Sequence, residues 1–133
     1  MAVRKGSNSS SPFNGVLPNN VTFTIGAEAA NSINVAIQLQ DGTVAVGERC
    51  AVDAYLSDDA NGDSVAGTAP DGNVAIGTDG VLIPIVVDKA FKLISESDGD
   101  IDLDIGEAAA DTWYLVVVTP DGKLHVSDAI TFA

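Results

Sequence analysis

The stretch that decides the fold runs from Asp111 to Phe132 and reads DTWYLVVVTPDGKLHVSDAITF. Its first part, Trp113 to Val118, is apolar, β-branched and aromatic, and it is too short for a stable lone helix, so it predicts a buried strand. Residues 120–122 (Pro-Asp-Gly) then reverse the chain, because proline presets φ and glycine accepts positive φ. Residues 123–127 should pair back as the second arm of a hairpin, with residues 129–132 as a last short strand. A hairpin is not stable alone in water, so the rest of the chain must cover it.

Short apolar stretches separated by turn residues fill most of the remaining chain. The clearest is residues 33–40, where a period of two over eight residues predicts a half-buried strand. Pro84 provides no hydrogen-bond donor, so the strand that contains it should lie at a sheet edge or carry a bulge. Residues 57–73 are predicted to form a long polar loop. The complete set of strands predicted before Trp113 is 21–25, 33–40, 43–46, 49–57, 74–76, 81–87, 91–95 and 100–105.

This pattern predicts an all-β protein built as a single antiparallel β-sandwich. The 13 glycines lie mostly in short polar segments between apolar runs, which is typical of many-turned β proteins. Two sheets packed face to face would bury the alternating apolar side chains. Tyr114, near the start of the penultimate long strand, and the terminal hairpin favour an immunoglobulin-like version. A jelly roll is the alternative.

The 133 residues suit one domain, which we place at residues 21–133. Residues 1–20 differ in composition: they are rich in serine, asparagine, glycine and proline and hold no acidic residue. We therefore predict a flexible N-terminal arm. These residues also lack the apolar core of a secretory signal, and the sequence has no 18-residue apolar run that would predict a membrane-spanning helix.

The net charge limits the possible partners. The chain carries a formal charge of −13, with Arg4 and Lys5 preceding every acidic residue. Such a charge repels nucleic acid and anionic lipid, because binding them requires cations that neutralise phosphates. We predict neither a nucleic-acid nor a membrane partner.

Catalysis is not predicted. The only cysteine, Cys50, falls on the apolar face of its predicted strand and should be a buried core thiol. The only histidine, His125, is predicted to share the outward face of the last hairpin with Lys123 and Ser127. A Cys50–His125 pair remains open, although nothing in the spacing favours it. No phosphate-binding, dinucleotide-binding or hydrolase motif occurs, so we predict that the protein is not an enzyme.

Two acidic segments are weak candidates for calcium, the only metal that the sequence suggests. The first is the ladder Asp98, Asp100, Asp102 and Asp104, whose last three carboxylates should share one strand face opposite the apolar residues between them. That face is either a solvated one that prevents edge aggregation or part of a calcium site completed by other loops. The second departs from the EF-hand pattern and is more simply a flexible acidic loop. The candidate ligands are Asp58, Asp59, Asp63, Asp98, Asp100 and Asp102.

Six segments carry a family resemblance, and they are Ala54–Asp59, Gly80–Pro84, Lys89–Phe91, Ser97–Asp102, Trp113–Val118 and Ala129–Phe132. Over residues 21–133 the chain resembles small acidic β proteins of tailed bacteriophages and prophages, and the head decoration (cement) proteins are the most similar kind. The resemblance implies a structural protein of the virion, made in the host cytoplasm and located on the capsid surface, with the major capsid protein as partner. It carries over no catalytic residue.

Docking is expected through the arm, at Phe13, Val16 and Leu17, or through the edge strand at Pro84. We predict a homo-oligomer, namely a trimer at a capsid symmetry point. The competing hypothesis is a binding module of a tail fibre or adhesin that holds calcium or carbohydrate in the loops at residues 57–73 and 96–100.

Overall fold

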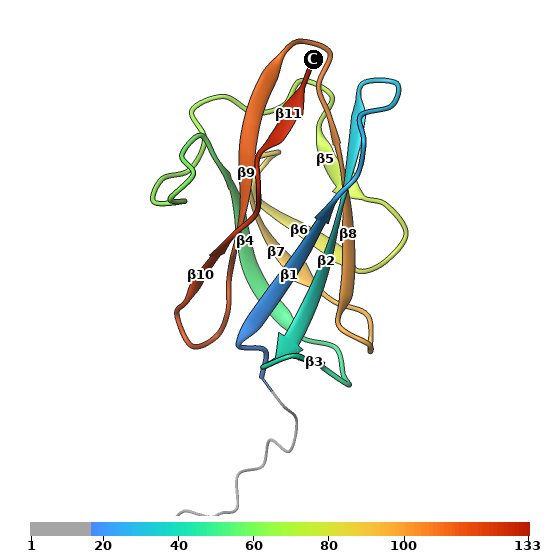
Figure 1. Ribbon diagram of the computed structural model, residues 1–133, viewed down its shortest axis with the longest axis vertical. Helices are drawn as coiled ribbons and strands as arrows, with labels where there is room; N and C mark the ends of the chain where they lie inside the picture. Colours follow the sequence, from blue (N-terminus) through green and yellow to red (C-terminus); the bar gives the residue numbers. More distant parts are fainter. Residues whose placement is uncertain (1–16) are drawn as a thin grey trace, which may run out of the picture.

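The computed structural model describes residues 17–133 and consists of two layers of β-strands (Figure 1). The alternating apolar side chains of the strands lie between these layers. The first sheet has the order β1-β2-β8-β5, and the short β3 pairs with the far end of β2. All of its pairings are antiparallel. Its strands are β1 (Asn20–Ile25), β2 (Ser32–Asp41), β3 (Val44–Ala45), β5 (Val74–Ile76) and β8 (Asp100–Gly106).

The second sheet has the order β10-β9-β4-β7-β6, and β11 pairs with the part of β9 that β10 does not reach. It is also antiparallel throughout. Its strands are β4 (Ala51–Ser57), β6 (Val81–Val86), β7 (Ala90–Ile94), β9 (Asp111–Val118), β10 (Leu124–Val126) and β11 (Ile130–Phe132). Residues 17–133 contain no helix, so the prediction of an all-β antiparallel sandwich is confirmed.

The core lies between the two sheets. Leu103 of the first sheet and Leu115 of the second are fully buried. Successive side chains of a strand point to opposite faces, and both leucines lie on the face that points inward. Trp113 is also fully buried, and its ring meets Phe132 edge to face at a centroid distance of 6.1 Å. Cys50 is buried in this core, as predicted.

The pairing order follows the immunoglobulin pattern, in which strands A-B-E-D face G-F-C. Strands β1, β2, β8 and β5 take the first four places, and β10, β9 and β4 take the other three. The β6–β7 hairpin is the difference, because it follows β5 in the chain and yet joins the sheet beside β4. Tyr114 does lie near the start of β9, but its hydroxyl has no hydrogen-bond partner among residues 17–133. The tyrosine that donates a hydrogen bond to the backbone is instead Tyr55, whose hydroxyl donates to the Gly62 carbonyl.

Two predictions about strands are settled by the pairing. Pro84 lies on the edge strand β6, and the register shifts between Pro84 and Val86, so both predicted features of this strand are confirmed. The acidic strand β8, by contrast, lies between β2 and β5 and is paired on both sides. Its aspartates therefore do not protect a sheet edge, and that part of the prediction is wrong.

The predicted loop is present between β4 and β5, at residues 58–73, but it is held against the second sheet. Gly62 is buried against Val116 and Val126, to such an extent that an added Cβ would lie 2.8 Å from a methyl of each. The indole Nε1 of Trp113 donates to the Thr68 carbonyl at 3.0 Å. These contacts correct the expectation of a flexible acidic loop, and they explain why Val116 is fully buried although its side chain faces away from the core.

His125 does not lie on the outward face. The register places it opposite Val117, whose side chain points into the core, and its Nε2 lies 3.0 Å from the hydroxyl of buried Thr119. The predicted outward position of Ser127 is also wrong, because Ser127 is buried. Leu124, which lies opposite Val118, is exposed instead. The predicted alternation is one residue out of phase, because the turn sets which residue faces Val118.

Candidate functional site

The most distinctive surface feature is a run of exposed apolar side chains on and just after β6. Their exposed fractions range from 38% at Val81 to 70% at Val87. We call this set the β6 strip, and its members are Val81, Ile83, Ile85, Val86 and Val87.

The strip is exposed because β6 has a neighbour on one side only. It pairs with β7, and no strand of residues 17–133 covers its other side. Leu82 points inward and packs against the core, which leaves Val81 and Ile83 facing solvent. The bulge after Pro84 then ends the simple alternation, so Ile85 and Val86 are both exposed.

The backbone of this edge is poorly suited to strand addition. Pro84 lies in the middle of β6 and has no N–H group to donate. A proline is tolerated on an edge strand when its nitrogen faces solvent. Such a residue interrupts the row of donors that an added strand would need, which is one way in which proteins prevent edge-to-edge pairing. Contacts at this edge are therefore expected to use side chains.

The charges around the strip also differ from those on the rest of the protein. Residues 80–94 hold one acidic residue, Asp88, and two lysines, whereas the chain as a whole carries −13. Lys92 bridges to Asp53 of β4 at 2.9 Å, and Lys89 donates to the Gly67 carbonyl. With Asp53 counted, the β6–β7 hairpin is thus a nearly neutral area on a strongly acidic protein.

The other predicted docking residues are only partly placed. Phe13 and Val16 lie outside the described residues. Leu17 is 56% exposed beside buried Pro18, and the following residue, Asn19, is fixed by its amide contacts to Asp41 and Gly42. Leu17 and the β6 strip are separate features of the structure.

The acidic face of β8 has a definite electrostatic structure. As predicted, Asp100, Asp102 and Asp104 face outward while the apolar residues between them are buried. Asp102 accepts hydrogen bonds from the backbone N–H groups of Thr78 and Asp79 and from the Asn34 amide. Burial acts to raise the pKa of Asp102, but these hydrogen bonds outweigh it and hold the pKa below its ordinary value.

Asp100 has the opposite shift. Burial raises its pKa first, and the nearby carboxylates of Asp98, Asp79 and Asp102 raise it further. Asp98 itself accepts a bond from the backbone N–H of Asp100. The same strand therefore carries one carboxylate that is stabilised by donors and one that is destabilised by its neighbours.

The second acidic segment folds its carboxylates onto its own loop. Asp58 accepts from Gly67 N–H, and Asp59 accepts from Asn61 N–H. A hydrogen bond with Asp59, together with its charge, raises the pKa of the Asp63 carboxyl. Within residues 17–133, no group of three or more histidine, cysteine, aspartate or glutamate side chains is arranged to hold a metal ion. The six calcium candidates are therefore not brought together.

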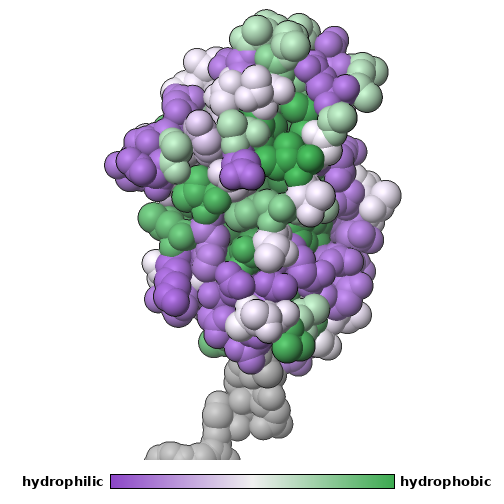
Figure 2. All heavy atoms as spheres, in the orientation of Figure 1, coloured by the Kyte–Doolittle hydropathy of each residue, from purple (hydrophilic) through white to green (hydrophobic). Residues whose placement is uncertain are grey.

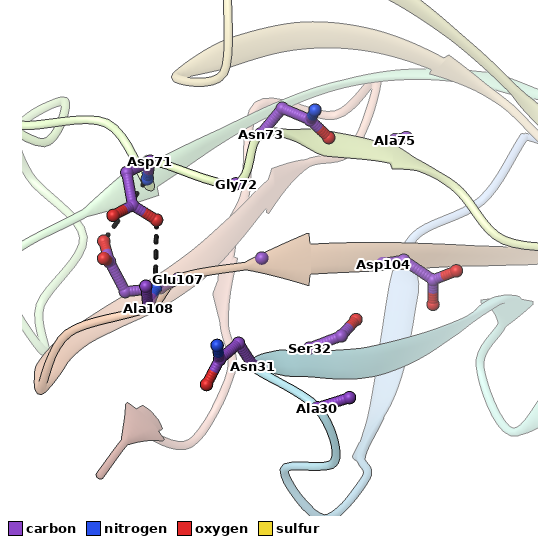
Figure 3. A pocket seen from close by; sticks show the side chains of 11 residues that line it. Ala30, Asn31, Ser32, Asp71, Gly72, Asn73, Ala75, Asp104, Glu107 and Ala108 are labelled. Carbon is purple, nitrogen blue, oxygen red and sulfur yellow. Dashed lines mark hydrogen bonds between the residues drawn. The ribbon is translucent and has the colours of Figure 1, made fainter.

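A polar pocket of about 450 Å³ lies at the end of the first sheet where β2 and β5 begin and β8 ends (Figure 3). On one side, Asp71 Oδ1 accepts from Ala108 N–H, and Glu107 accepts from the backbone of Asp71. Asp104 lies apart from this pair and accepts from Asn34. The pocket carboxylates thus hold loops together. Of the lining residues, Asp104 belongs to the predicted acidic face and residues 71–73 to the predicted loop, but the sequence did not predict that they share a pocket.

A second apolar area follows the junction of the two sheets. Figure 2 shows hydrophobic residues gathered along the middle of the face on which β1 and the β10–β11 edge lie next to each other. A groove of about 310 Å³ runs here, lined by Phe23, Ile25 and Val126, all of them half-buried. The two sheets are tied at one end by a hydrogen bond from Ala133 N–H to the Glu28 carboxylate.

The two side chains suited to nucleophilic chemistry are Cys50 and His125, and burial shifts the pKa of each. Burial raises the pKa of the Cys50 thiol, and the Glu48 carboxylate adds to that effect, so little thiolate forms at neutral pH. The Cys50 Sγ lies 3.4 Å from the Glu48 carbonyl. Burial lowers the pKa of His125, which contacts Thr119. Neither Cys50 nor His125 lines the pocket or the groove.

Comparisons with known proteins give no assignment: no protein-family model matches the sequence, and no curated protein matches it. In the described part of the chain, no helix is long and apolar enough to cross a bilayer.

The sequence predicts the position of the candidate site, at Pro84, but not its extent. The five apolar side chains around Pro84 were not predicted to be exposed, because an apolar strand is normally assigned to the core. The available signal was the lack of alternation in residues 81–87 together with the proline that places this strand at an edge.

Proposed function

We propose that this protein is a non-enzymatic structural component of a tailed-phage virion, a decoration protein that binds the major capsid protein and stabilises the head. The observation that carries the proposal is an acidic β-sandwich on which, within residues 17–133, the exposed large apolar side chains are concentrated in the β6 strip. Large exposed apolar patches mark interaction sites. The resemblance of residues 21–133 to small acidic phage β proteins is the reason for proposing a phage capsid as the partner.

The physical properties suit such a role. A decoration protein needs a stable domain and a surface that meets neighbours, and it needs no reactive group. A high net charge keeps many copies apart in solution before assembly. The proposed partners are the major capsid protein and further copies of this chain, and Phe13, Val16, Leu17 and Pro84 remain the proposed docking positions.

The test is the location of the protein in purified particles of the phage that encodes it. Mass spectrometry should find it in many copies per particle, and electron microscopy should show density of its size on the outer capsid surface. Its absence from particles, or a copy number of only a few per tail, would refute the proposal.

A second function, a binding module of a tail fibre or adhesin, is favoured by the polar pocket at Asn31, Asn73 and Glu107. Asn73 has a φ of 69°, so Asn73→Gly would remove the amide and keep the backbone conformation. A glycan array and a calcium titration on both forms test this alternative. A ligand that binds the unaltered chain and is lost with Asn73→Gly would favour it over the capsid role.

A further inference from the structure

We propose that the β6 strip is a self-association surface, at which one copy of this protein binds the same strip of another copy. This inference rests on the proposed structural function, which requires copies to assemble. It assigns an occupant to a surface that the fold leaves uncovered.

The first argument is the concentration of exposed apolar area. Five of the nine large apolar side chains that are exposed in residues 17–133 belong to the strip, and they are nearly consecutive. The other four are spread over distant segments, and they are Leu17, Val44, Val65 and Leu124. The apolar residues of the groove beside β1 are half-buried, and two of them, Phe23 and Ile25, pack against the core. Of these apolar surfaces, the strip is thus the one whose burial would be most favourable.

The second argument is charge, and it selects a second copy as the occupant. Two acidic molecules repel each other, and the repulsion is smallest where their surfaces carry the least negative charge. Outside residues 80–94, the described chain holds 18 acidic residues against two basic ones, Arg49 and Lys123. Inside residues 80–94 there is one acidic residue, Asp88, against Lys89 and Lys92, and Lys92 is paired with Asp53 of β4, so the hairpin together with this ion pair is close to neutral. The strip is therefore the face on which two copies can approach with the lowest electrostatic cost.

The third argument fixes the kind of contact. Because Pro84 interrupts the row of backbone donors, two β6 strands cannot form a continuous hydrogen-bonded ladder. The strips instead pack side chain against side chain around a symmetry axis, which is how closed homo-oligomers repeat a contact.

The fourth argument concerns strength. A stable interface buries about 800 Å² on each partner. The strip offers on the order of a few hundred Å², as large patches on monomers do. Association is therefore weak in solution and becomes extensive only at the high local concentration that a shared scaffold provides.

The experiment is sedimentation of the full chain over a concentration range from about 10 μM to about 1 mM at physiological salt. The test variants are Ile83→Lys and Ile85→Lys. Lysine lowers the negative charge, so a loss of association cannot come from added repulsion between acidic molecules. The matched control is Leu124→Lys, because Leu124 is 49% exposed and Ile83 is 46% exposed, and Leu124 lies on β10 at the opposite edge of the same sheet.

We expect the unaltered chain and Leu124→Lys to associate with concentration, and either strip variant to weaken association at least tenfold with an unchanged circular-dichroism spectrum. The mass of the associated species gives the number of copies. A chain that stays monomeric up to about 1 mM, or a control that weakens as much as the strip variants, would overturn the inference. Binding to purified capsids is measured separately: a monomeric chain that binds capsids refutes the inference alone, whereas an associating chain that never binds them refutes only the proposed function.

Discussion

At the scale of single residues, Gly62 determines how the loop of residues 57–73 lies on the second sheet. It has a φ of 70°, and a Cβ at this position would lie 2.8 Å from methyl groups of Val116 and Val126. Gly62→Ala should therefore lower the free energy of unfolding by about 2 to 4 kcal/mol, through backbone strain and overpacking together. Denaturation in urea measures this loss.

The matched control is Gly42→Ala. Gly42 has a similar φ of 62°, but nothing lies within 4 Å of a Cβ added there. Only the backbone strain remains, and it should cost about 1 kcal/mol. Equal losses at the two glycines would show that the loop is not packed tightly against Val116 and Val126 at Gly62.

Two aspartates on β8 should have opposite effects on stability. Asp102 has a lowered pKa in the folded state, so its stabilisation is present above the ordinary aspartate pKa of about 3.9 and is lost as the pH falls through the lowered value. Asp102→Asn should cost about 1 to 2 kcal/mol at pH 7, because donors to a carboxylate lose their charged acceptor. Denaturant unfolding at several pH values measures the effect.

Asp100 has a raised pKa in the folded state, so its ionisation destabilises the fold. This destabilisation is absent below the ordinary pKa and complete above the raised one. Asp100→Asn should therefore increase stability at pH 7, and the difference between the two variants should shrink below a pH of about 3. Losses of the same sign in both variants at pH 7 would contradict the assignment of donors to Asp102.

At the scale of elements, the edge strand β6 is apolar and yet protected by Pro84. Pro84→Thr would restore a backbone donor to an exposed apolar edge, so we expect faster formation of thioflavin-positive aggregates on agitation. Native stability should change by no more than about 0.5 kcal/mol, as is usual for exposed positions. Pro120→Thr in the exposed β9–β10 turn is the control, and equal aggregation of both variants would count against a protective role of Pro84.

At the scale of the whole molecule, the charge of −13 opposes compactness. Raising sodium chloride from about 20 mM to about 0.5 M shortens the screening length several-fold, so the melting temperature should rise by several degrees. A variant with Asp98→Asn and Asp100→Asn should show a smaller rise, because part of the repulsion is already removed. A melting temperature that falls with salt would mean that ion pairs such as Lys92–Asp53 outweigh the repulsion.

The sequence by itself determined the strands, the main turns and the edge position of Pro84. These follow from the backbone, because side chains alternate along a strand and proline and glycine restrict or permit particular φ values. Trp113, Leu103 and Cys50 were placed in the core for the same reason. The single-domain sandwich then followed from the need to cover the apolar faces.

Only the tertiary structure decided which strands are neighbours and what covers each face. It placed β8 between two partners, turned His125 towards the core, laid Gly62 over Val116 and left the β6 strip uncovered. Each of these depends on pairing between segments far apart in the chain, and a shift of one residue in that pairing exchanges the inner and outer faces. Local patterns carry no information about such distant contacts, so the sequence gives the position of the candidate site through Pro84 but not which apolar side chains around it stay uncovered.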